Sequence, residues 1–165
     1  RYLTGATISP MAAVLVMRGL KTLSLRMERH AATALKVAEF LEAHPAVAWV
    51  SYPYLKSGPS YAIARRQMTN GSGMLSFGLK RGFEGARSLL GHLELVTCAV
   101  SLGDAETLIS HPATLTRARK KIRPEATLAP GVGEDLIRLS VGLEDDADLI
   151  HDLQRALSRV EAGHE

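Results

Sequence analysis

The 165-residue chain contains a single cysteine, Cys98, which rules out an internal disulfide and a cysteine-based zinc cluster. Its six histidines follow no metal-ligand spacing. No apolar stretch reaches the length of a membrane-spanning helix, and no signal-peptide pattern is present. These absences predict a cytoplasmic protein without a metal site or a membrane partner, in which Cys98 is a small buried residue.

The chain also lacks a strong charge of either sign, because its formal net charge is only +3. The basic excess is concentrated in residues 117–123, and such a run is usually a solvated helix or loop face. No nucleic-acid-binding motif accompanies it, so we expect no nucleic-acid partner. The glycines at 71–73 and 131–133 do not form a phosphate-binding loop that leads into a helix.

What is present is enough apolar sequence for one ordinary domain, since 46% of the residues are hydrophobic. The chain begins with Arg1 rather than methionine, which favours a fragment of a longer protein.

Two helices are predicted at the start of the chain. Ser9 and Pro10 form a helix N-cap and first turn, and this helix is expected to end near Gly19. A second helix is expected to end at Ala43, because His44 precedes a proline. Its apolar residues recur every three or four positions and form one stripe: Leu20, Leu23, Met27, Ala31, Ala34, Ala38 and Leu41.

The remainder alternates between strand and helix patterns. Strands are predicted at 47–52, 74–79 and 136–141, an extended segment at 94–102, and helices at 59–68, 83–93 and from Asp145 onward. The last helix has an apolar stripe of Leu149, Leu153, Ala156, Leu157 and Val160. Alternation by itself favours a parallel α/β domain.

The strand at 136–141 separates its side chains by chemistry. Ile137, Leu139 and Val141 point to one face, and Arg138 and Ser140 point to the other. The apolar face requires a core. An arginine fixed in mid-strand on the opposite face matches the two oxygens of a carboxylate.

Arg138 is therefore the first candidate binding residue, and the hydroxyls of Ser101 and Thr116 are possible further donors to the same anion. From the residues alone, an equally good interpretation is a structural ion pair between Arg138 and Glu144 or Glu106. Ser101 has a structural alternative too, as a turn serine that caps a backbone group.

Several separate blocks resemble one enzyme family, in the family's order. They are AVSLGDAETLISHPATLT (99–116), LIRLSVGLED (136–145) and the segment from Ser9 to Leu55. Together they are similar to the C-terminal part of the Cys/Met-metabolism enzymes that use pyridoxal phosphate, a family that includes the methionine and cystathionine gamma-lyases. The resemblance extends from about Gly5 to Leu157.

The resemblance implies an α+β fold rather than a parallel one. We expect a mainly antiparallel sheet with helices on one face, preceded by a long helix, and an active site toward the other face. Residues 1–43 would be linking helices and residues 44–165 the small C-terminal domain. The pyridoxal-phosphate-binding domain would lie upstream of this chain.

The resemblance also implies roles for individual residues. Arg138 would bind the substrate α-carboxylate, with Ser101 and the backbone amide of Leu102 beside it and Thr116 as a weaker candidate. The family usually has histidine after this threonine, whereas this chain has Arg117, so the loop that follows departs from the family pattern. The His111-Pro112 pair matches the family and is expected to shape a turn.

No cofactor-binding or catalytic residue is expected in this chain. In the family, the lysine that forms the Schiff base lies in a Ser-X-Thr-Lys context, upstream of everything present here. None of the chain's lysines has that context: Lys21, Lys36, Lys56, Lys80, Lys120 and Lys121. Pyridoxal phosphate would be held mainly by the upstream domain, so the isolated chain would be inactive. The alternative is a noncatalytic paralogue or interaction module.

Within the family, Asp104 together with Ser101 is most similar to methionine gamma-lyase. That similarity implies α,γ-elimination of methionine to methanethiol, 2-oxobutanoate and ammonia by a cytoplasmic homotetramer. Cystathionine gamma-lyase or synthase and homoserine sulfhydrylase remain alternatives.

Overall fold

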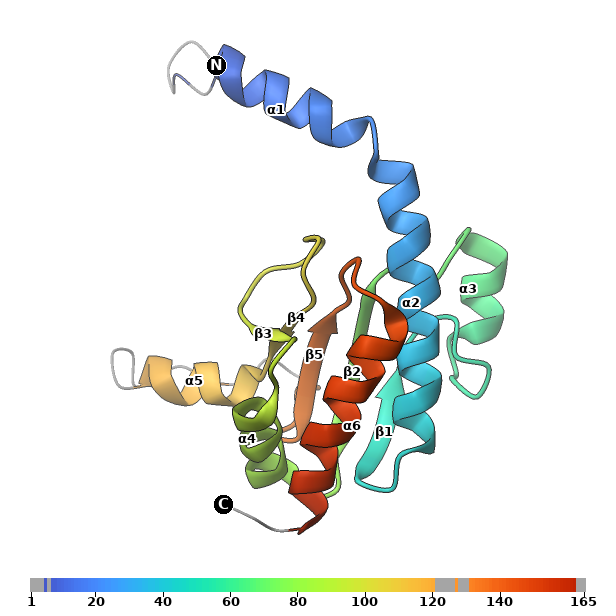
Figure 1. Ribbon diagram of the computed structural model, residues 1–165, viewed down its shortest axis with the longest axis vertical. Coiled ribbons are helices and arrows are strands. Elements are labelled where there is room, and N and C mark those ends of the chain that lie inside the picture. Colours follow the sequence, from blue (N-terminus) through green and yellow to red (C-terminus); the bar gives the residue numbers. More distant parts are fainter. Residues whose placement is uncertain (1–4, 6, 121–126, 128–130, 163–165) are drawn as a thin grey trace.

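The computed structural model describes residues 5, 7–120, 127 and 131–162 (Figure 1). In chain order its elements are α1 (Pro10–Leu20), α2 (Leu23–Ala43), β1 (Val47–Ser51), α3 (Tyr61–Gln67), β2 (Met74–Leu79), α4 (Gly82–His92), β3 (Thr97–Cys98), β4 (Leu108–Ser110), α5 (Pro112–Lys120), β5 (Leu136–Ser140) and α6 (Asp146–Ala162). The first two helices, the strands β1, β2 and β5, and the helices α4 and α6 confirm the predicted elements to within one or two residues at most ends.

The strands form one sheet in the order β1-β2-β5-β4-β3. The pairs β1–β2, β2–β5 and β5–β4 are antiparallel, and only the short β3–β4 pair is parallel. The mainly antiparallel α+β fold is thus confirmed, and the parallel arrangement favoured by alternation alone is wrong. The physical reason is that β5, the last strand of the chain, pairs between β2 and β4 and runs opposite to both.

One face of the sheet carries the hydrophobic core. Helices α2, α4 and α6 cover this face, in front of the strands in Figure 1. The inward side chains of the two central strands are fully or almost fully buried against them: Leu75, Phe77, Leu79, Ile137 and Leu139. The predicted stripe of α6 is buried in full. Burial of aliphatic and aromatic side chains at this interface supplies the main driving force for folding.

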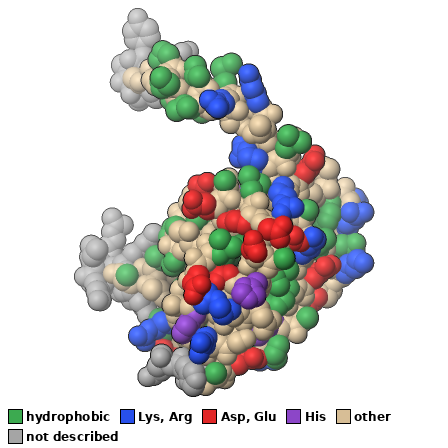
Figure 2. Space-filling view, in the orientation of Figure 1, with side chains coloured by type: hydrophobic (Ala, Val, Ile, Leu, Met, Phe, Trp, Pro, Cys, Tyr) green, Lys and Arg blue, Asp and Glu red, His purple; other side chains and the backbone are tan. Residues whose placement is uncertain are grey.

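The predicted stripe of the second helix is only half right. From Ala31 to Leu41 its members are buried against the sheet, but Leu20 and Leu23 are exposed. The difference arises because α1 and the first turns of α2 extend away from the body of the domain (Figure 1). No residue of α1 is buried, and Figure 2 shows hydrophobic side chains spread over it.

Five further local features differ from the expectations. Strand β4 and helix α5 were not predicted, and α5 begins at Pro112, where only a turn was expected. The expected helix at 59–68 begins at Tyr61, after Pro59. The extended segment at 94–102 contains only the two-residue strand β3. Cys98 within it is exposed rather than buried, because β3 is the edge strand.

A buried carboxylate joins α6 to the segment that leads into β3. Asp152 is 4% exposed and accepts hydrogen bonds from the backbone amides of Glu94, Leu95 and Val96, at 3.0, 3.0 and 3.1 Å, and from Arg155 at 2.7 Å. Burial by itself would raise the pKa of the Asp152 carboxyl, but these hydrogen bonds outweigh burial and hold its pKa below the ordinary value.

Replacing Asp152 with asparagine removes this charge and presents an amide donor to the backbone amides. We expect Asp152→Asn to lower the free energy of unfolding by about 2–3 kcal/mol at neutral pH. The pKa of Asp152 is lower in the folded protein than in the unfolded chain. The stabilisation by the ionised carboxylate is therefore complete above the unfolded pKa of about 3.9, and it is lost as the pH falls through the lower pKa of the folded protein. Urea unfolding of both proteins at pH 7 and near pH 3 measures it. A difference independent of pH would contradict the carboxylate role.

Helix α1 carries apolar side chains around its circumference, and such a helix is stable in water only when other surfaces pack against it. Within the described residues no helix is long and apolar enough to cross a membrane. Because the large apolar side chains of α1 are exposed, we expect this helix to contact other protein. Residues 1–165 alone should therefore self-associate or bind a hydrophobic dye, and a variant lacking residues 1–21 should do so less. Sedimentation and dye fluorescence check this. A monomer without dye binding would contradict the expectation.

Candidate carboxylate-binding site

Arg138 lies at the middle of the sheet, on the face that the three core helices leave open. It is a residue of β5, where its register partners are Ser76 on β2 and Ser110 on β4. Side chains of register partners share a face, so the guanidinium is flanked by two small hydroxyl side chains. The expectation that Arg138 points away from the core is confirmed, and the side chain is half-buried.

One donor of the Arg138 guanidinium is used within the domain. Nη2 donates a hydrogen bond of 2.5 Å to the backbone carbonyl oxygen of Ser101. Within the part of the chain that the structure describes, Arg138 forms no ion pair, so neither Glu144 nor Glu106 neutralises it as a structural partner. An arginine with this one neutral acceptor keeps donors available for an anion.

Ser101 belongs to an exposed loop that connects β3 to β4. The loop turns at Gly103, whose φ of +72° is a conformation that glycine adopts without strain. Gly103 N donates to Ser140 Oγ at 3.1 Å, and Leu143 N donates to the carbonyl of Ala105 at 2.7 Å. Ser140, predicted on the same face as Arg138, is buried there because this loop covers it.

The end of the loop is joined to the chain beyond β5 through Glu144. Its carboxylate accepts from Thr107 N at 2.5 Å and from Thr107 Oγ1 at 2.7 Å. The same hydroxyl oxygen accepts from Gly142 N at 2.8 Å. Two chain segments that lie 37 residues apart are thereby held by a closed set of hydrogen bonds.

Helix α2 holds the other side of this turn. Nδ1 of the buried His30 lies 3.0 Å from the carbonyl of Gly142, so this nitrogen carries the proton. Arg29 Nη2 donates to the carbonyl of Glu144 at 3.1 Å. The 142–145 turn is consequently fixed between α2 and the loop that carries Ser101.

The predicted site residues are brought together unequally. Arg138 and Ser101 are in contact through the Ser101 carbonyl, and Leu102 follows directly, with its side chain 61% exposed. Thr116 lies half-buried on α5 and forms no hydrogen bond with Arg138 or Ser101 in the described structure. The basic stretch 117–123 begins on α5 and ends outside the described residues.

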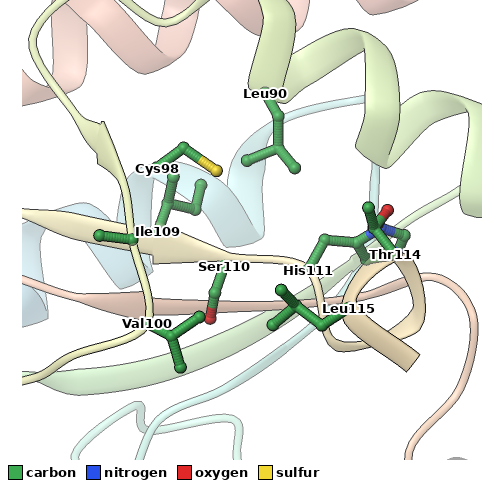
Figure 3. Close-up of a pocket in the computed structure, with 9 residues that line it drawn as sticks. Leu90, Cys98, Val100, Ile109, Ser110, His111, Thr114 and Leu115 are labelled. Carbon is green, nitrogen blue, oxygen red and sulfur yellow. The ribbon is translucent and has the colours of Figure 1, made fainter. Parts of the chain in front are cut away.

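A separate cavity of about 100 Å³ lies between α4, the ends of β3 and β4, and α5 (Figure 3). Its lining is mostly apolar, and the Cys98 sulfur points toward Leu90 in it. His111 contributes to the wall, but both its ring nitrogens are engaged, with Thr114 Oγ1 and the Glu134 carbonyl at 2.8 Å each. Since no charged side chain lines it, this cavity is unsuited to a zwitterionic amino acid.

Two further kinds of site would require, among the described residues, a cluster of metal ligands or an enclosed lysine. No cluster of three or more metal-binding side chains occurs among them. The lysines at 21, 36, 56 and 80 are all exposed, and Lys36 pairs with Asp146. None therefore occupies the enclosed position in which a lysine could hold such a group.

Comparison with known proteins decides the family. Residues 1–158 match the family described as Cys/Met metabolism PLP-dependent enzyme. The chain belongs to this family. It is 49% identical over 158 residues to the L-methionine gamma-lyase of Treponema denticola, an alignment that covers 96% of this chain and 39% of that enzyme.

Two solved structures of family enzymes share the fold. The crystal structure of metB from Corynebacterium glutamicum superposes with a TM-score of 0.85 at 40% identity, covering 94% of this chain and 39% of that one. The cystathionine gamma-lyase of Lactobacillus plantarum, complexed with L-serine, gives 0.82 at 38% identity, covering 95% and 40%. The chain thus spans about two fifths of the length of the relatives it matches.

Sequence reasoning missed the roles of Thr107, Ser140 and Glu144 at this site. Glu144 was considered only as an ion-pair partner of Arg138, whereas its carboxylate binds Thr107. The available signal was that all three residues lie inside the two blocks that carry the family resemblance.

Because the lysines at 21, 36, 56 and 80 are exposed, residues 1–165 mixed with pyridoxal phosphate should yield no stoichiometric adduct on a single lysine. Borohydride reduction followed by peptide mass spectrometry measures the labelling of each lysine. Low labelling spread over several lysines is the expected result. One lysine labelled to completion would contradict it.

Proposed function

We propose that this chain is the C-terminal part of a pyridoxal-phosphate-dependent carbon–sulfur lyase and that its open sheet face binds the α-carboxylate of a sulfur amino acid. In this proposal residues 1–43 link the small domain, residues 44–165, to an upstream domain that holds the cofactor. The second half of α2 nevertheless packs on the sheet of the small domain.

The observation that carries the proposal is the state of Arg138. A half-buried guanidinium stands in mid-sheet without a carboxylate partner in the described structure, and a backbone carbonyl holds it at 2.5 Å. A cation left in that state would weaken the domain unless an anion from elsewhere completes it. A substrate carboxylate fits, because its two oxygens match the planar fork of arginine.

The loop beside Arg138 supplies further donors. The Ser101 hydroxyl and the Leu102 amide donate to no described residue, and both lie next to the carbonyl that holds Arg138. They support a site in which Arg138 binds the carboxylate and neutral donors refine its position. Thr116 is a weaker candidate that would act from α5.

These residues bind and orient, and they carry out no bond breaking. Pyridoxal phosphate, when bound, supplies the electron sink for breaking bonds at the substrate α-carbon. Fixing the carboxylate restricts rotation of the amino acid, so the bond to be broken is kept in the required direction.

Methionine is the proposed substrate, with α,γ-elimination to methanethiol, 2-oxobutanoate and ammonia. Support comes from Ser101 together with Asp104 and from the similarity to the methionine gamma-lyase of T. denticola. Cystathionine is the second candidate, favoured by the structural similarity to the L. plantarum enzyme. Assays of the full-length protein on methionine, cystathionine and O-acetylhomoserine distinguish these substrates.

The exposed apolar surface of α1 supports an assembly beyond this chain. We propose that α1 packs on the upstream domain and on a second subunit of a cytoplasmic homo-oligomer, a tetramer by analogy with the family. Sedimentation of the full-length protein tests this proposal.

Replacing Arg138 with alanine in the full-length enzyme should lower kcat/KM by about thirty- to a thousandfold, or roughly 2–4 kcal/mol, because a charge-assisted bidentate contact is lost. Arg138→Lys should recover part of this, since it keeps the charge but not the planar fork. Ser101→Ala should cost about 1–2 kcal/mol.

Steady-state kinetics and thermal unfolding on the same variants separate binding from stability. Unchanged kcat/KM for Arg138→Ala, with a lowered Tm, would overturn the proposed function and assign Arg138 a structural role.

A further inference from the structure

We infer that Glu144 is a positioning residue for Arg138, acting through Thr107 and the loop that carries Ser101. This inference rests on the proposed function of Arg138 as the carboxylate-binding residue. It adds a residue that touches neither substrate nor cofactor but determines where the guanidinium is held.

The loop between β3 and β4 has little apolar packing of its own. Residues 101–106 are all exposed, and the side chains of Val100 and Leu102 are 60% and 61% exposed. A loop without buried side chains keeps a single conformation only where hydrogen bonds hold it. The position of the Ser101 carbonyl, and so of the Arg138 guanidinium, therefore depends on these bonds.

Of the hydrogen bonds that tie this loop to the segment 140–144, the two accepted by Glu144 have an ionised acceptor. Its two carboxylate oxygens bind the amide and the hydroxyl of Thr107, and Thr107 is 1% exposed. Hydrogen bonds to an ionised acceptor are about twice as strong as neutral ones. The bonds between Gly103 and Ser140 and between Leu143 and Ala105 join neutral groups.

Glu144 can act as a fixed support because its own backbone is held from the opposite side. Arg29 of α2 donates to its carbonyl at 3.1 Å, and His30 holds the carbonyl of Gly142 at 3.0 Å. The Thr107 hydroxyl closes the arrangement by accepting from Gly142 N at 2.8 Å. A rigid helix thereby determines the place of an exposed loop.

Loss of the contact between Glu144 and Thr107 would reach Arg138 through the loop. When Glu144 no longer binds Thr107, the loop loses its charged support and the Ser101 carbonyl becomes variable in position. Arg138 then loses its only protein acceptor in the described structure and samples other rotamers. Carboxylate affinity and orientation decline together, although no group that meets the substrate has changed.

The first test uses matched pairs in the full-length enzyme. Glu144→Gln is nearly isosteric and replaces one acceptor with a donor, and Glu106→Gln makes the same charge change on an exposed side chain of the same loop. Thr107→Val removes the hydroxyl at constant shape, whereas Thr107→Ser keeps it. We expect Glu144→Gln and Thr107→Val to lower kcat/KM by about 5- to 50-fold, chiefly through KM, and the two control variants to change it less than about twofold.

The second test asks whether Glu144 acts through Arg138. In an Arg138→Ala background, adding Glu144→Gln should change kcat/KM by less than about twofold, because the guanidinium that it positions is gone. The fall in Tm caused by Glu144→Gln should be the same in both backgrounds. A purely structural role predicts equal effects on Tm and no change in kcat/KM per folded molecule.

Each outcome decides one of the two proposals. If Arg138→Ala lowers kcat/KM but Glu144→Gln does not, or if the two effects multiply independently, this inference is overturned and the proposed function stands. If Arg138→Ala leaves kcat/KM unchanged, the proposed function fails and this inference fails with it. Should Glu144→Gln not fold, the Thr107→Val and Thr107→Ser pair in the two Arg138 backgrounds gives the same decision.

Discussion

The antiparallel pairing of β5 with β2 on one side and β4 on the other is the constraint on which the rest of the structure depends. It places the final strand of the chain at the centre of the sheet. Ile137 and Leu139 then join the core beneath α2, α4 and α6, and Arg138 is forced onto the open face. One strand thus links the stability of the domain to the position of its candidate binding residue.

Apolar packing holds the backbone of the core in place, whereas hydrogen bonds to ionised carboxylates hold the backbone of the loops. Asp152 holds three consecutive backbone amides ahead of β3, and Glu144 holds Thr107 at the end of the following loop. Each carboxylate binds an irregular segment of backbone that has few buried apolar side chains. The polar supports therefore occur where the sheet ends and irregular backbone would otherwise be free to move.

Two features of the domain lack a partner among the described residues, and the proposed function accounts for both. Helix α1 is apolar without cover, and Arg138 is cationic without a carboxylate partner in the described residues. An apolar surface calls for protein, whereas an available guanidinium calls for an anion. Helix α1 is accordingly suited to an assembly contact, and the open sheet face is suited to a substrate.

The sequence by itself determined the elements whose signals are local. Ser9 and Pro10 specify the start of α1, the stripe from Leu149 to Val160 specifies α6, and the alternation around Arg138 specifies which face each side chain takes. These patterns depend only on helix and strand periodicity and on capping. The motif blocks also sufficed to indicate the family.

Only the tertiary structure decided the contacts between residues distant in sequence. It paired Glu144 with Thr107 rather than with Arg138, left Cys98 exposed on an edge strand, and made a strand of the three residues 108–110. A three-residue strand has too little periodicity to be recognised without its neighbour, and a carboxylate can bind any donor that the fold brings near. Such choices depend on which segments the sheet places side by side, because hydrogen bonds act only over about 3 Å.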